Sequence, residues 1–187
     1  MENIITSEER IAELYKKHGV VVFIFNPNGN VLVTQETMSR ESTGKSVGDY
    51  GVLCETTEPG EFVATTVVRG VSEELGVEEI QQAAMFTFNP ENCYLGETMF
   101  IEGVLARVFV LHANESYVFR PNQVFSDEIE IAGWFNLQEL SDLQLRPGVK
   151  NILDDISNSG LQLEAVTLED PVPLTRDNLL QVLSGFK

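Results

Sequence analysis

The sequence predicts an α/β fold, an α/β/α sandwich in which a mixed β-sheet lies between helices. Two observations support this class. Strand-like apolar runs come before and after one helix-like segment at 61–75, and helical patterns dominate the C-terminal end. The 187 residues allow one hydrophobic core at about 150 residues per domain. We therefore expect a helical segment at 1–18, the core domain at 19–145, and a helical extension at 146–187 packed on the same domain.

The N-terminal part of the chain predicts a helix, a hairpin and a loop. Ser7 is a favourable helix cap before an amphipathic stretch that ends at Gly19. The runs 20–25 and 31–35 are β-branched or aromatic, and the Asn-Gly turn between them is typical of a β-hairpin. The polar segment 36–48 lacks apolar periodicity, so we expect a long loop there.

The rest of the chain predicts the central helix, four strands and three helices. Apolar side chains recur at steps of four in 61–75, which indicates a helix with one buried face, and Gly76 ends it. The predicted strands are 83–88, 98–111, 116–119 and 130–136. The predicted helices run from an Asn136 cap through Leu143, from Arg146 to about Ile156, and from Leu174 to Leu183.

The composition excludes several classes of partner. The chain has 12 Lys and Arg residues against 29 Asp and Glu residues, a formal net charge of −17. Such a charge repels nucleic acid and anionic membranes, so we expect neither as a partner. Cys54 and Cys93 have no zinc-binding spacing and indicate reduced, structural thiols. The acidic N-terminus and the short apolar runs predict a cytoplasmic protein without a signal peptide or membrane span.

The segment 55–77, which reads ETTEPGEFVATTVVRGVSEELGV, contains the residues that suggest chemistry. On a helix, residues 70, 73 and 74 share one face. Glu73 and Glu74 place carboxylate oxygens together, and magnesium needs only one or two protein carboxylates when phosphates and waters complete its coordination. Taken alone, paired glutamates on a helix are nearly always a solvated face. The spacing of the whole segment therefore decides between a metal site and a solvated face.

This spacing resembles the Nudix box: Gly, five residues, Glu, seven residues, Arg-Glu, an aliphatic residue, any residue, Glu-Glu, any residue, Gly and an aliphatic residue. The matching fixed positions are Glu61, Arg69, Val71, Glu73, Glu74, Gly76 and Val77. Glu58 and Gly60 match the common turn inside the box. Two positions depart, because Glu55 stands in place of the first Gly and Gly70 in place of the first Glu of the Arg-Glu pair. The surrounding pattern agrees with a Nudix frame over about 19–143.

The resemblance implies a hydrolase that cleaves a pyrophosphate linkage in a nucleoside-diphosphate-linked or related compound. It implies that Mg²⁺ or Mn²⁺ is held by Glu73 and Glu74, and that Arg69 orients this acidic cluster, so these three are the expected catalytic residues. The expected structural residues of the box are Glu58, Gly60, Glu61 and Gly76. Arg40 and Lys45 are rare positive charges in the loop, and we expect them to line the entrance for a small phosphorylated substrate.

The departure at Gly70 leaves the activity open. In the family, this position is a metal ligand or a general base, so its loss predicts weakened activity unless another acid substitutes. Six acids are candidate substitutes: Glu58, Glu97, Glu102, Asp127, Glu128 and Glu130. If the box face points to the metal, a Gly70→Glu variant should fit sterically. The alternatives are a non-catalytic Nudix domain that binds a phosphorylated ligand or a protein partner, and a structural or assembly subunit; a homodimer is also open.

Overall fold

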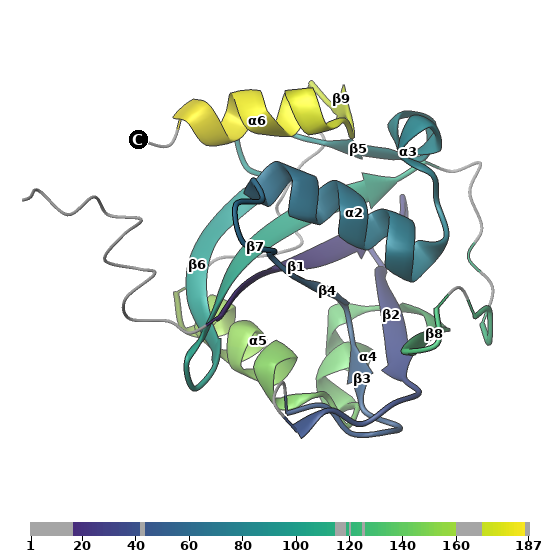
Figure 1. Cartoon of the computed structure of the whole chain (residues 1–187). Helices are drawn as coiled ribbons and strands as arrows, with labels where there is room; N and C mark the ends of the chain where they lie inside the picture. The colour runs from purple at the N-terminus through teal and green to yellow at the C-terminus, as the bar shows by residue number, and fades with distance from the viewer. Residues whose placement is uncertain are drawn as a thin grey trace, which may run out of the picture.

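The computed structural model shows a mixed β-sheet with helices on both faces (Figure 1). The residues that it describes are 17–41, 44–114, 119, 121–124, 126–159 and 170–185. The helix predicted after Ser7 lies outside these residues. The strands are β1 (Lys17–Phe25), β2 (Val31–Glu36), β3 (Tyr50–Gly51), β4 (Leu53–Thr56), β5 (Phe86–Phe88), β6 (Tyr94–Ile101), β7 (Val104–Ala113), β8 (Ile129–Phe135) and β9 (Val172–Pro173). The helices are α2 (Val63–Leu75), α3 (Glu79–Met85), α4 (Leu137–Asp142), α5 (Pro147–Ser159) and α6 (Arg176–Gly185).

Strand β1 organises the sheet because it pairs with three other strands. It runs parallel to β7 over its whole length, and antiparallel to β2 and β4. The sheet continues from β2 to β3 and β8, and from β7 to β5 and β6. One parallel pair among antiparallel neighbours makes the sheet mixed, which confirms the predicted fold class.

The core has two parts because successive side chains of a strand point to opposite faces of the sheet. Val20, Val22 and Ile24 of β1 belong to the core cluster that includes the buried residues of α2 and α6. The alternate residues, such as Val21 and Phe23, belong to the cluster that includes buried residues of α4 and α5. Figure 1 accordingly shows α2 and α6 on one face of the sheet and α4 and α5 on the other.

Helix α2 forms although several of its residues are β-branched and one is glycine. Its buried residues are Ala64, Thr66, Val67, Val68, Gly70, Val71 and Leu75. Burial of this apolar face outweighs the low helix propensity. The helix ends at Gly76, whose positive φ of 63° is costly for residues with a side chain. Gly70 therefore lies on the face of α2 that packs on the sheet.

Two predicted strands are wrong in part. The segment 83–88 is a strand only at Phe86–Phe88, because α3 occupies the preceding residues. The Gln82 amide docks α3 by donating to the Val68 carbonyl oxygen at 2.9 Å and the Ser72 hydroxyl at 2.9 Å, contacts that local propensity does not encode. The single strand predicted at 98–111 is a hairpin of β6 and β7, and Gly103 turns the chain with a φ of 75°.

The strand and helices predicted for the C-terminal part of the chain agree more closely with the structure. Strand β8 and helix α4 form as predicted, and Asn136 and Glu139 make a reciprocal capping box at the start of α4. Helix α5 extends to Ser159, and α6 begins at Arg176 rather than at Leu174 because Thr175 caps it through a 3.1 Å hydrogen bond from the Asn178 N–H. Most of the strand predicted at 116–119 lies outside the described residues. Among the helices that the structure describes, none is long and apolar enough to cross a membrane.

Candidate active site

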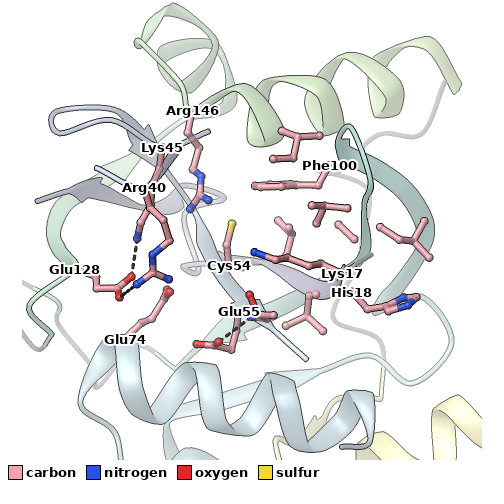
Figure 2. A pocket seen from close by; sticks show the side chains of 18 of the residues that line it. Lys17, His18, Arg40, Lys45, Cys54, Glu55, Glu74, Phe100, Glu128 and Arg146 are labelled. Atoms are coloured by element: carbon pink, nitrogen blue, oxygen red, sulfur yellow. Dashed lines mark hydrogen bonds and ion pairs between the residues drawn. The ribbon is translucent and has the colours of Figure 1, made fainter. Parts of the chain in front are cut away.

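A pocket of about 310 Å³ brings together residues that lie far apart in the sequence (Figure 2). Its acidic end is formed by Glu55 of β4 and by Glu73 and Glu74 of α2. Its basic end contains the loop residues Arg40 and Lys45, together with Arg146 before α5. The apolar part of the lining includes Phe100, Val104, Leu105 and Ala106. A lining that contains both carboxylates and cations suits a ligand that combines anionic groups with a cation.

Arg69 holds the acidic end together. Its guanidinium makes a bidentate pair with Glu61, from Nε to Oε1 and from Nη2 to Oε2, both at 3.0 Å. Nη2 also donates to the Thr56 carbonyl oxygen at 2.6 Å. Nη1 faces Oε1 of Glu55 at 3.1 Å and Oε2 of Glu73 at 3.2 Å. One arginine thus contacts three carboxylates, those of Glu61, Glu55 and Glu73.

The pair with Arg69 makes Glu61 a structural anchor. Hydrogen bonds from Arg69 lower the pKa of Glu61 to about 2, and those with Glu61 raise the pKa of Arg69. The Glu61 carboxylate also accepts the backbone N–H of Glu58 at 2.9 Å and the Thr66 hydroxyl at 3.0 Å. Gly60 has a φ of 80° in the turn between Glu58 and Glu61. These contacts join the box turn to α2.

Glu73 and Glu74 occupy different environments. The side chain of Glu73 is 57% exposed, whereas Glu74 reaches into the pocket and interacts with the backbone of Cys54. Burial raises the pKa of Glu74 well above its usual value, and the negative charges of Glu55 and Glu36 raise it further. Burial also raises the pKa of Glu55. A cation at this end would offset the excess negative charge.

Gly70 packs directly against β4. A Cβ atom at position 70 would lie 2.9 Å from Cβ of Glu55 and 3.2 Å from Cδ2 of Leu53. The first distance is shorter than real Cβ contacts allow, so the expectation that Gly70→Glu fits sterically is wrong. The space for a side chain at position 70 is filled by Glu55, which sequence reasoning did not consider as a substitute acid.

The six acids proposed from the sequence as substitutes lie elsewhere or are paired. Of the six, Glu128 alone is among the described residues that line the pocket. Its carboxylate accepts from Lys45 at 2.7 Å and pairs with Arg40, so the pKa of Glu128 is lowered by Lys45 first. Glu97 pairs with Arg107 at 2.7 Å on the sheet. None of these contacts replaces the carboxylate missing at position 70.

The basic end of the pocket is a buried ion network. Lys45 Nζ lies 3.0 Å from Oε2 of Glu36, and Arg146 Nη1 lies 2.7 Å from Oε1 of the same residue. The Arg146 guanidinium also lies over the Phe100 ring, 5.1 Å from its centroid. Arg40 and Lys45 pair with Glu128, and Lys45 and Arg146 pair with Glu36. Sequence reasoning found Arg40 and Lys45 but missed Arg146 and Glu36.

The remaining pocket residues do not suggest nucleophilic chemistry. Burial raises the pKa of the Cys54 thiol to about 12, so this cysteine stays protonated. Within the described parts of the chain, no group of three or more His, Cys, Asp or Glu residues is arranged to hold a metal ion. The carboxylates of Glu73 and Glu74 still suit Mg²⁺ or Mn²⁺, because these cations accept a few carboxylates when ligand phosphates and waters complete the shell.

Comparisons with known proteins agree with this architecture. A model of the NUDIX domain family matches residues 16–156. A Nudix hydrolase from Nitrosomonas europaea has a TM-score of 0.53 at 21% identity, covering 82% of this chain and 97% of that one. An Ap4A hydrolase complex from C. elegans has a TM-score of 0.53 at 15% identity, with coverages of 75% and 96%.

A MutT protein from Methanosarcina mazei is similar at the same level, with a TM-score of 0.52, 16% identity and coverages of 78% and 96%. Identities this low show a shared fold and nothing finer. No curated protein matches the chain. The family match covers strands β1 to β8, the box and the residues that line the pocket, and it ends within α5.

Proposed function

Because the chain belongs to the Nudix family, we propose that it is a hydrolase that cleaves the pyrophosphate linkage of a nucleoside-diphosphate-linked or related small compound. The observation that supports this most strongly is the pocket with carboxylates at one end and cations at the other. A pyrophosphate ester carries several negative charges, so it needs cations on both sides. The protein supplies them at the basic end, and we propose that Mg²⁺ or Mn²⁺ supplies them at the acidic end.

The residues of this chain have distinct parts in the proposed reaction. Lys45 and Arg146 attract phosphate oxygens, and their buried pairs with Glu36 hold them in place. Arg69 keeps the carboxylates of α2 and β4 oriented. Phe100 and its apolar neighbours exclude water from one wall and can contact the part of the substrate that carries no phosphate.

The proposed chemistry is hydrolysis at phosphorus. A water oxygen forms a bond to one phosphorus and gives up a proton to solvent, while the bond from that phosphorus to the bridging oxygen breaks. The bridging oxygen leaves on the second product, and both products carry a phosphate. Glu73 and Glu74 would hold the divalent cation, which supplies charge neutralisation and lowers the pKa of water. Catalysis of this type rests mainly on positioning and electrostatic stabilisation, which are the properties that the pocket residues provide.

The test is a panel of nucleoside-diphosphate derivatives assayed for phosphate or nucleotide release with Mg²⁺ and with Mn²⁺. We expect turnover of at least one compound by the parent, and a loss of about 100-fold or more in the Glu73→Gln plus Glu74→Gln variant. The matched control is Glu78→Gln plus Glu79→Gln, which removes two exposed charges just after α2 and should leave turnover unchanged. Equal turnover in both double variants would exclude the proposed roles of Glu73 and Glu74.

The absence of a carboxylate at position 70 favours a second candidate, a Nudix domain that binds a phosphorylated ligand without cleaving it. Calorimetric titration with the same compounds distinguishes the hydrolase from the domain that only binds its ligand. Binding without turnover, weakened by Arg146→Met, would support the second candidate, because this substitution keeps the apolar bulk and removes the charge. Turnover would exclude it.

A further inference from the structure

We propose that Glu55 and Gly70 are an exchanged pair, in which the carboxylate that the Nudix box places on α2 is supplied instead from β4 by Glu55. In this inference, which rests on the proposed function, Glu55 joins Glu73 and Glu74 in binding the divalent cation. Without the cation, Glu55 and Glu73 face Arg69 and no three of the described acids converge on one point, so their carboxylates must turn from Arg69 toward the cation when it binds. The two departures from the box, Glu55 and Gly70, then compensate each other. The carboxylate missing at position 70 is replaced by the one at position 55, so the number of acids is unchanged.

Steric fit between α2 and β4 is the first support for the exchange. The atoms nearest to a Cβ at position 70 include Cβ and Cγ of Glu55, at 2.9 and 3.3 Å. A glutamate at both positions would overlap, and a glycine at both would leave an unfilled space between α2 and β4. A glycine at one of the two positions removes this overlap, although a side chain at position 70 also requires Leu53, whose Cδ2 lies 3.2 Å from such a Cβ, to move by a few tenths of an ångström. The two positions that break the box pattern therefore fill one shared volume.

The orientation of the Glu55 carboxylate is the second support. Its Oε1 accepts the backbone N–H of Thr56 at 2.8 Å and faces Arg69 Nη1 at 3.1 Å. The same Nη1 faces Glu73, so Arg69 ties Glu55 and Glu73 to each other. Figure 2 shows Glu55 reaching toward α2 from β4, on the side of the pocket where Glu74 reaches in from the helix. All three acids line the same pocket.

The opposite end of the pocket gives a third support that is independent of the acids. Arg146 is only 6% exposed, and its Nε has no hydrogen-bond partner among the residues that the structure describes. Figure 2 shows its guanidinium pointing into the pocket. Its Nη1 pairs with Glu36, so Nε is a donor that remains for an oxygen atom of an anionic ligand. The acids at the other end of the pocket need a cation between them and that ligand.

The test uses Mn²⁺ alone as the probe and measures its affinity by calorimetric titration of the whole chain. Glu55→Gln keeps the shape of the side chain and removes the charge. We expect it to weaken Mn²⁺ binding by at least about 10-fold, and to reduce the rise in melting temperature that Mn²⁺ gives the parent. Glu97→Gln is the matched control, since it removes another strand glutamate that pairs with an arginine outside the pocket, and it should leave the affinity unchanged.

The exchange itself is tested by reversing it. Gly70→Glu alone should lower the melting temperature because of the overlap with Glu55. Glu55→Gly combined with Gly70→Glu should recover both the melting temperature and the Mn²⁺ affinity, because it moves the carboxylate to α2 and frees the space on β4. A double variant that folds as well as the parent but binds Mn²⁺ as weakly as Glu55→Gln would overturn the proposal.

Two further outcomes are decisive. If Glu55→Gln lowers the melting temperature but binds Mn²⁺ like the parent, Glu55 is only a packing and ion-pair residue, and the inference is wrong. If the double variant fails to fold, the Glu55→Gln titration decides by itself. The proposed function fails separately: a parent that binds Mn²⁺ through Glu55 but cleaves none of the compounds refutes the hydrolase and leaves this cation site in place.

Discussion

Removing the charge of Glu61 should destabilise the protein by about 3 kcal/mol at pH 7. The pKa of Glu61 falls from an ordinary 4.5 to about 2 because Arg69 donates hydrogen bonds to it. A tenfold change in proton affinity corresponds to about 1.4 kcal/mol, so the difference of about 2.5 between the two pKa values gives roughly 3 kcal/mol. The Glu61 side chain is only 10% exposed, so solvent screens this interaction little. The variant Glu61→Gln keeps the side-chain shape.

The lowered pKa of Glu61 also determines how the stability of the folded protein depends on pH. The folded-state pKa is lower than the unfolded-state pKa, so the stabilisation by Glu61 is fully present above about 4.5 and is lost as the pH falls toward about 2. The parent should therefore lose this part of its stability between these values. The Glu61→Gln variant should lack this stabilisation at every pH. The stabilities of the parent and the variant should therefore converge near pH 2.

Urea unfolding at pH 7, 4.5 and 3, followed by circular dichroism, measures both effects. The control is Glu58→Gln, which changes an exposed glutamate of the same turn and should alter stability by less than about 0.5 kcal/mol. If parent and Glu61→Gln have the same stability at pH 7, or the same dependence on pH, the Arg69 pair is not the anchor of the acidic end.

Two other predictions concern the frame around the pocket. Asn136→Ala removes the capping box of α4 and should cost about 1 kcal/mol in urea unfolding, whereas Asn136→Ser should cost less because serine also caps. Gly148→Ala places a Cβ that overlaps the Phe100 ring, so it should lower stability by about 1–3 kcal/mol, and an unchanged unfolding midpoint would show that α5 is not packed on this ring.

The parts of the fold that the sequence predicted are those that local patterns encode. The hairpin of β1 and β2 follows from its apolar runs and the Asn-Gly turn, in which the Asn26 carboxamide accepts the backbone N–H groups of Asn28 and Asn30. Helix α2 follows from the spacing of its buried residues. The hairpin of β6 and β7 was missed because a turn of two residues, Glu102 and Gly103, lies inside a long apolar run.

The parts of the site that could not be predicted from the sequence depend on contacts between residues that lie far apart along the chain. Glu36 and Arg146 meet although 110 positions separate them, and neither belongs to a motif. Glu55 was visible in the sequence as a departure from the Nudix box. Its position against Gly70 depends on how β4 crosses the face of α2, and residue spacing does not encode that. The sequence signal for this contact is that both departures from the box pattern, Glu55 and Gly70, occur in one motif.

The charge of the molecule constrains how this pocket can bind. With a net charge of −17, the protein as a whole repels an anionic ligand, so steering from a distance opposes binding. Of the 12 basic residues, Lys17, Arg40, Lys45 and Arg146 line the pocket, and Arg69 lies beside it. Their charges act mainly within a few ångströms, because beyond about 10 Å salt screens them. Recognition of a phosphorylated compound would therefore depend on contacts made inside the pocket, and the cation that we propose beside Glu55, Glu73 and Glu74 would reduce the repulsion between these acids and the phosphates.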